Sequence, residues 1–149
     1  MPLAIARPIA IVAFVLCAML VAVTDVHAQQ AVPPGDQSAT RQVIDEQIAA
    51  FRSGAHDRAY SYAAPNIKQV FPTVERFIGM VQGGYMPLYS PDSYVFGRST
   101  LIGEQVLQEV IVTDGSGQQW QAIYTLVKQP DGSWKISGVK LDPYKGVSA

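Results

Sequence analysis

The chain has 149 residues, 11 Lys and Arg side chains against 12 Asp and Glu, and a formal net charge of −1 at pH 7. A near-neutral chain without a basic run does not have the positive surface that binds phosphates, so we expect no nucleic-acid partner. The single cysteine, Cys17, cannot form an intramolecular disulfide, so the fold must be held together by its core.

The first 28 residues have the order of regions that is typical of a secretory signal peptide. Arg7 precedes an apolar run from Pro8 to Val23, and Val26-His27-Ala28 places small or apolar residues before the Ala28–Gln29 bond. The run is shorter than the roughly 20 apolar residues that a transmembrane helix needs. We therefore expect a periplasmic or secreted protein that meets the membrane only through this leader, a retained anchor being the alternative.

The next segment should lead into a long helix. Residues 29–37 are polar with two prolines and a glycine, which predicts a flexible tether. Helical spacing starts after Ser38, a residue type that caps helix N-termini, and Gly54 supplies a stop. The apolar residues of this expected helix are Val43, Ile44, Ile48 and Phe51.

Shorter helical segments should follow. Asp57 is placed to cap a helix over residues 58–63, and residues 67–71 have the pattern of a further helical turn before Pro72. Thr73 can cap a helix that Gly83-Gly84 ends and that carries Phe77, Ile78 and Val81. We expect a loop over residues 84–91, which are rich in proline and aromatic residues.

After Pro91 the apolar period becomes two, which predicts strands over residues 94–101, 106–113, 118–128 and 133–141. Each connection is short and carries Gly, Asp or Pro, so neighbouring strands must be antiparallel. The predicted fold class is α+β, with N-terminal helices packed on a curved four-stranded antiparallel meander. The domain should span residues 38–142, and residues 143–149 should form a C-terminal tail.

The turns also predict which residues face each other. Closing the second hairpin on Gly115-Ser116 places a set of large apolar residues together on one face, which we expect to meet the helices. The predicted pairs are Ile111 with Trp120, Glu109 with Ala122, and Leu107 with Tyr124.

The third hairpin should close on Pro130-Asp131-Gly132, which places Leu126 opposite Ile136. In the last strand, Trp134 and Ile136 have even numbers, whereas Val139 and Leu141 have odd numbers. Strict alternation would therefore point these two pairs of side chains to opposite faces of the sheet. A β-bulge at Ser137-Gly138 would return all four side chains to the helix-facing side and would bend the sheet.

Helices followed by a strongly curved antiparallel sheet resemble the nuclear transport factor 2-like superfamily, whose cone-shaped fold often encloses a pocket. The chain is also similar, across residues 38–141, to a bacterial family known as domain of unknown function 4864. This resemblance implies the cone fold and export, and it assigns no catalytic residue. The matching blocks are Ala50-Phe51, Ala59-Tyr60-Ser61-Tyr62-Ala63-Ala64-Pro65, Phe77 with Met80-Val81, Gly84-Tyr85-Met86-Pro87, Val106-Leu107-Gln108, Val112-Thr113-Asp114 and Asp131-Gly132-Ser133-Trp134-Lys135-Ile136-Ser137-Gly138-Val139.

No set of residues predicts a particular chemistry. His56 is the only histidine after the leader, so no histidine pair can form a metal site, and Ser61 and Ser99 have no histidine near them in the sequence. The aspartate base and the tyrosine–aspartate pair of ketosteroid isomerase, another cone-fold protein, have no recognisable counterpart. We therefore assign no catalytic residue, metal ligand or cofactor.

Aromatic residues nevertheless suit the wall of a pocket for an amphipathic ligand, although burial of each ring in the core, with its hydroxyl at the surface, is the more common arrangement. Closing the first hairpin on Gly103-Glu104 places Arg98 opposite Glu109 and Phe96 opposite Ile111, so that an Arg98–Glu109 ion pair is expected at the rim or inside the pocket. The candidate pocket residues are Tyr60, Tyr85, Tyr89, Arg98, Glu109, Trp120 and Tyr124.

The leading functional hypothesis is a non-enzymatic binding module for a small apolar or amphipathic ligand or for a protein partner. A small cone-fold enzyme of the isomerase or hydratase type is the alternative. A third possibility is a structural role, with the sheets of two copies paired in a homodimer.

Overall fold

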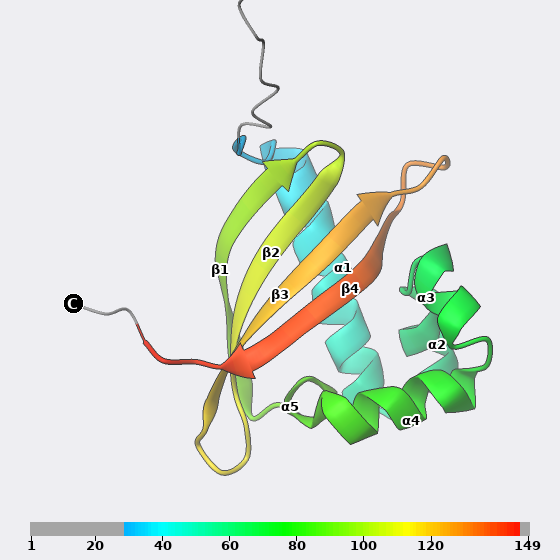
Figure 1. Cartoon of the computed structure of the whole chain (residues 1–149), viewed down its shortest axis with the longest axis vertical. Helices are drawn as coiled ribbons and strands as arrows, with labels where there is room; N and C mark the ends of the chain where they lie inside the picture. The colour runs from blue at the N-terminus through cyan, green and yellow to red at the C-terminus, as the bar shows by residue number, and fades with distance from the viewer. Residues whose placement is uncertain (1–28, 147–149) are drawn as a thin grey trace, which may run out of the picture.

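The computed structural model of the chain describes residues 29–146, in which five helices pack with a four-stranded antiparallel sheet (Figure 1). The strands follow each other in the order β1-β2-β3-β4, as expected for a meander. The predicted leader, residues 1–28, lies outside the described residues. No helix of the described part has the length and apolar character that crossing a membrane requires.

Helix α1 (Pro34–Arg52) starts earlier than expected. Pro34 occupies the first turn, where its fixed φ suits a helix and its missing N–H costs nothing. Ser38 therefore lies inside the helix, where its hydroxyl donates to the carbonyl of Pro34 (3.0 Å), and its expected role as N-cap is wrong. Gly54, with a φ of 69°, follows the end of the helix as predicted.

The segment before α1 is not the flexible tether that its composition predicted. Gln30 exchanges two backbone hydrogen bonds with Leu101 (3.1 and 2.8 Å), and so adds a short bridge to the edge of the sheet. Val32 is buried in the main hydrophobic core. The segment has few apolar residues, and its backbone hydrogen bonds to the sheet fix it in place.

The other helices are short: α2 (His56–Ser61), α3 (Pro65–Val70), α4 (Val74–Gly84) and α5 (Met86–Tyr89). Thr73 caps α4 as predicted, because its hydroxyl accepts a hydrogen bond from the Arg76 N–H (3.2 Å). Asp57 lies inside α2 and makes no capping bond, so its predicted role is wrong. Helix α5 occupies part of the expected loop.

The strands are β1 (Ser93–Ile102), β2 (Gln105–Thr113), β3 (Gln119–Lys128) and β4 (Trp134–Pro143), close to their predicted bounds. The expected tail begins inside β4, and the Tyr144 N–H still donates to the carbonyl of Gln119 (3.0 Å).

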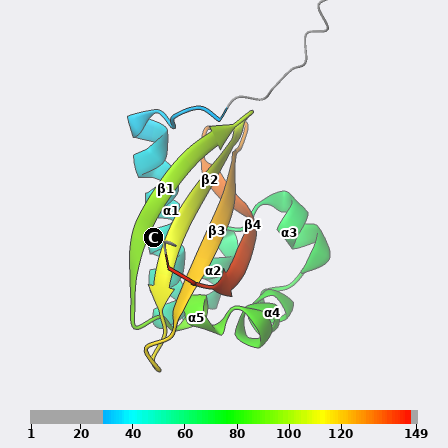
Figure 2. The ribbon, with the colours of Figure 1, turned by 60° about the vertical axis from the view of Figure 1, so that its left-hand side comes forward.

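Helix α1 runs along the sheet, and α2 to α4 lie beside the β4 edge (Figures 1 and 2). No helix of residues 29–146 covers the opposite face of the sheet (Figure 2).

The predicted register between β2 and β3 is wrong by one residue. The observed partners of Gln108, Val110 and Val112 are Tyr124, Ala122 and Trp120. Because side chains alternate along a strand, this shift turns every residue of β2 to the other face. Gln108 therefore faces the helices, whereas Leu107, Glu109 and Ile111 lie on the bare face.

The cause of the shift is the turn. Asp114 and Gln118 close a three-residue loop, in which Gly117 adopts a φ of 85°, instead of a two-residue turn on Gly115-Ser116. The Asp114 carboxylate stabilises this loop by accepting hydrogen bonds from the N–H groups of Ser116 (2.9 Å) and Gln118 (3.0 Å).

The third hairpin and its bulge confirm the prediction. Leu126 pairs with Ile136 and Thr125 pairs with Gly138, so Ser137 is the extra residue. Val139 and Leu141 consequently return to the helix-facing side and pack against the core.

A second bulge, not predicted, lies in β1, where Gly97 and Arg98 together face Glu109. The fully buried amide of Gln108 holds it: its Nε2 donates to the carbonyls of Gly97 (3.2 Å) and Glu109 (2.7 Å). Arg41 of α1 donates to Gln108 Oε1 and to the Gly97 carbonyl, both at 3.1 Å, and the Ser99 hydroxyl also bonds that Oε1. This network joins helix, bulge and sheet.

The network generates a stability prediction. Replacing Gln108 by leucine should lower the free energy of unfolding by about 2–3 kcal/mol, because Arg41 and Ser99 lose a buried acceptor. The control Gln105→Leu, at an exposed position of the same strand, should change it by less than about 0.5 kcal/mol. Urea unfolding measures both, and equal effects would contradict a special role for Gln108.

Candidate functional site

A cavity of about 270 Å³ lies between the helices and the β3–β4 half of the sheet, and it is partly open to solvent. Its wall is apolar except for three polar side chains, those of Gln47, Tyr85 and Tyr124. The remaining lining residues are Phe51, Ala63, Ile67, Phe71, Phe77, Met80, Val81, Leu88, Ile136, Gly138 and Val139. The cavity wall, as defined by these residues, carries no charged side chain.

The shape of β4 at its edge leaves space for this cavity. The chain after α2 pairs with this edge: Ile136 N–H donates to the carbonyl of Tyr62 (2.9 Å), and Ala64 N–H donates to that of Ile136 (2.8 Å). Directly after this bridge, the Ser137 bulge bends β4. Gly138 contributes no side chain, and a Cβ built on it meets no atom within 4 Å.

Two of the three polar residues in the wall have hydrogen-bond partners in the protein. The Tyr85 hydroxyl donates to the carbonyl of Val139 (3.2 Å). Gln47, which is 5% exposed, donates from Nε2 to the carbonyl of Ala59 (3.2 Å). The Gln47 bond joins α1 to α2, and the Tyr85 bond joins the C-terminal end of α4 to β4.

Tyr124 is different, because its hydroxyl is buried and has no hydrogen-bond partner among residues 29–146. The residue is only 1% exposed, and this burial is the main cause that raises the pKa of its hydroxyl, with a smaller effect from Tyr94. A buried hydroxyl without a partner costs about 1–3 kcal/mol, so such groups in native proteins usually meet a water or a ligand. Tyr124 therefore offers a neutral donor and acceptor that the fold does not use.

Of the candidate pocket residues, the structure places Tyr85 and Tyr124 in the cavity wall. Tyr60 and Tyr89 lie behind the wall. The Tyr60 hydroxyl donates to the carbonyl of Phe71 (2.6 Å) and its ring packs on Phe77, with ring centroids 5.2 Å apart. The ring of Tyr89 packs on Phe51 (5.5 Å), and its hydroxyl bonds His56 Nε2 (3.0 Å). Both tyrosines thus support aromatic rings that do line the cavity.

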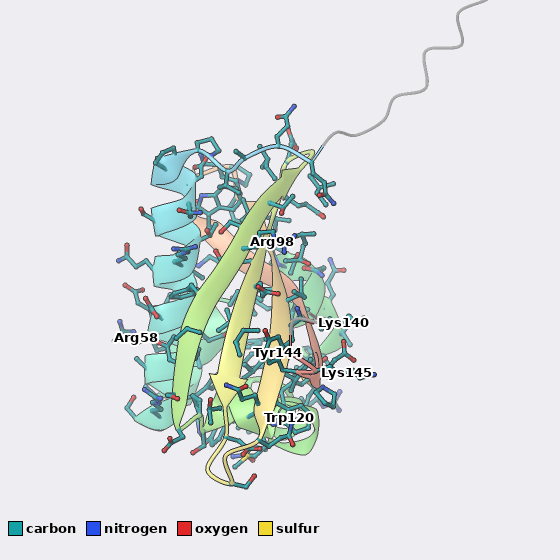
Figure 3. All side chains as sticks on the ribbon, turned by 90° about the vertical axis from the view of Figure 1, so that its left-hand side faces the viewer. Arg58, Arg98, Trp120, Lys140, Tyr144 and Lys145 are labelled. Carbon is teal, nitrogen blue, oxygen red and sulfur yellow. The ribbon has the colours of Figure 1, made fainter. Side chains whose placement is uncertain are left out.

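The prediction was wrong for Arg98, Glu109 and Trp120. Within the described chain Arg98 and Glu109 form no ion pair. One carboxylate oxygen of Glu109 accepts instead from the Arg98 backbone N–H (3.4 Å) and the other from Gln121. Trp120 lies on the helix side at the far end of the sheet, where its indole N–H donates to Asp114 (2.9 Å). Figure 3 shows Arg98 and Trp120 well apart along the sheet.

Gln47 is the important residue that the sequence analysis missed. It follows Ile44 by three positions and precedes Phe51 by four, so it lies on the apolar face of α1. A polar residue on such a face was the available signal. Phe77 of α4 was predicted as one of the apolar residues of its helix, and periodicity does not separate a core position from a cavity wall.

Comparisons with known proteins agree with this fold. The model of the family described as "Domain of unknown function (DUF4864)" matches residues 34–149. An NTF-2 like protein of unknown function from Silicibacter pomeroyi DSS-3 is similar in structure, with a TM-score of 0.52 and 13% identity over 76% of this chain and 100% of that one. A second such protein, from Shewanella baltica OS155, has a TM-score of 0.51 and 12% identity over 77% and 100%. No curated protein matches the chain.

The two tyrosines of the cavity wall allow a matched test. Tyr85→Phe should lower the free energy of unfolding by about 1 kcal/mol, because the carbonyl of Val139 loses its donor. Tyr124→Phe should leave it unchanged within about 0.5 kcal/mol or raise it, because no bond is lost. Urea unfolding without added ligand distinguishes them, and an equal loss in both would show that Tyr124 has a partner, such as a buried water.

Proposed function

The chain belongs to the family described as "Domain of unknown function (DUF4864)", and we propose that its cavity binds a small, neutral, largely apolar ligand. The observation that carries this proposal is the wall itself, which combines eleven apolar lining residues with three polar ones and no charge. A concave, mostly apolar site with few polar groups is the usual form of a small-molecule pocket. The leader predicted in residues 1–28 would bring this domain to the periplasm.

The volume limits the size of the ligand. A cavity of roughly 150 Å³ is large enough for benzene, so 270 Å³ accommodates a compound of about two fused rings or a short branched chain. The absence of charged lining residues also limits its chemistry. A carboxylate or an ammonium group would lose its hydration without gaining a counter-charge, so the ligand should be neutral.

The lining supports binding more than catalysis. A general acid or base needs a group whose pKa lies near the working pH, and the lining offers only the phenols of Tyr85 and Tyr124 as titratable groups. The Tyr85 hydroxyl bonds a backbone carbonyl, and burial raises the pKa of Tyr124 further from neutrality. A cone-fold enzyme would need a carboxylate or a histidine in this wall.

Naphthalene is a suitable probe because it is neutral, apolar and of the expected size. At a concentration ten times its Kd it should raise the free energy of unfolding by about 1.4 kcal/mol, which appears as an increase in Tm. Calorimetric titration gives the Kd directly.

A space-filling variant tests whether the probe occupies this cavity. Gly138→Leu should abolish the increase in Tm, because Gly138 lies in the wall and its backbone does not require glycine. The control Gly83→Leu, at an exposed glycine of α4 outside the wall, should keep it. An absence of binding to the wild-type protein, or unchanged binding in a folded Gly138→Leu variant, would contradict the proposal.

A further inference from the structure

We infer that the ligand of the cavity carries a carbonyl group, whose oxygen accepts a hydrogen bond from the backbone N–H of Val139 in β4. This inference rests on the proposed function and deepens it, because it names the polar group of the ligand. The evidence is the outer edge of β4 over residues 136–139, where Ile136, Gly138 and Val139 line the cavity.

The direction of the Val139 N–H follows from its carbonyl. In a strand, the N–H and C=O of one residue lie on the same side of the strand. The Val139 carbonyl accepts from the hydroxyl of Tyr85 (3.2 Å), which belongs to the cavity wall. The N–H of Val139 therefore points to the same side, away from β3.

The ladder between β3 and β4 gives the same direction. The Tyr144 N–H bonds β3, and residues 139–143 pair with β3 without a shift in register. Alternate residues of a strand bond on opposite sides, so Val139, five positions before Tyr144, has its N–H directed outward. Because β4 is the edge strand, outward means toward the side of α2 to α4 (Figure 1).

The neighbouring polar groups of this edge have partners within the protein. Ile136 exchanges two backbone hydrogen bonds with the chain after α2, and the carbonyl of Ser137 accepts from the side chain of Asn66 (2.9 Å). The Val139 N–H differs, because no acceptor of residues 29–146 outside the sheet bonds it. A backbone donor must be paired once it is withdrawn from water, so a ligand that covers this N–H has to supply an acceptor.

Gly138 leaves this N–H accessible. It has no side chain, so it lines the cavity with backbone atoms alone, and the Val139 N–H belongs to the peptide group that follows its Cα. Its φ is not positive, and a Cβ built on it meets no atom within 4 Å, so packing does not require glycine. A glycine within a strand often marks a place where a ligand approaches the backbone closely.

A carbonyl oxygen fits this donor better than other polar groups do. A carboxylate also accepts, but no charged side chain lines the cavity to compensate for its lost hydration. An alcohol brings a hydrogen that needs an acceptor, and the carbonyl of Val139 is already bonded by Tyr85. A ketone or an ester on an apolar body accepts without donating and remains neutral.

Acetophenone and α-methylstyrene form a matched pair of probes, because they have the same shape and differ in a C=O against a C=CH2 group. Both are small enough for a cavity of about 270 Å³. In proton–nitrogen NMR spectra of the wild-type protein, acetophenone should move the Val139 amide proton downfield and slow its exchange with solvent. We expect α-methylstyrene to do neither. The amide of Leu141, which points outward on the same edge but outside the wall, is the control and should change with neither probe.

A variant assigns the effect to this one donor. Val139→Pro removes the N–H without removing a bond of the sheet, because the N–H is directed outward from an edge strand. Calorimetric titration should show the ratio of the two Kd values changed by about fivefold in favour of α-methylstyrene. Leu141→Pro, which removes an outward N–H outside the wall, should leave this ratio within about twofold. The Tm of each variant shows whether it is folded.

The outcomes separate this inference from the proposed function. If naphthalene binds but acetophenone leaves the Val139 amide unchanged, the cavity is a binding site and the inference of a carbonyl is wrong. Equal changes of this amide with both probes, or equal weakening of both by a folded Val139→Pro variant, also overturn it. If that variant does not fold, the spectra of the wild-type protein decide. If neither naphthalene nor the matched probes bind to the wild-type protein, both proposals are overturned.

Discussion

The buried amide of Gln108 is the interaction on which the shape of the domain depends. Polar groups enclosed in a core are usually hydrogen-bonded, and Gln108 reaches its partners because β1 bulges at Gly97 and brings a carbonyl within reach. Arg41 bonds the same carbonyl and thereby fixes α1 against β1. The bulge of β4 at Ser137 bends the opposite edge, where the chain after α2 is attached. The two bulges curve the sheet, and the cavity lies inside that curve.

Much of the fold could be predicted from the sequence where a signal had one physical solution, whereas the expected caps Ser38 and Asp57 lie inside their helices. Thr73 could cap only α4, and the parity of Val139 and Leu141 required a bulge. The second hairpin had two solutions, because Asp114-Gly115-Ser116-Gly117 suits both a two-residue and a three-residue loop. The choice depended on the Asp114 carboxylate, whose bonds to Ser116, Gln118 and Trp120 favour the longer loop. The longer loop sets the observed register, which places Glu109 on the bare face and Gln108 in the core.

The site was less predictable than the fold for a different reason. A cavity is a place where packing is incomplete, and it depends on how far α4 lies from β4, which no residue pattern encodes. Tyr85 and Tyr124 were predicted as amphipathic residues, and the structure places both in the wall. Glu109 was predicted as an anchor through the wrong register. Gln47 needed a different criterion, namely a polar side chain on the apolar face of a helix, and that criterion identifies the residue without any structure.

The partly open cavity beside β4 also has a thermal consequence. Its apolar wall is in contact with solvent in the native state, so unfolding exposes less new apolar surface there than it would in a filled core. This part of the domain therefore contributes little to the heat capacity of unfolding. An occupant would withdraw the wall from water and would increase that heat capacity.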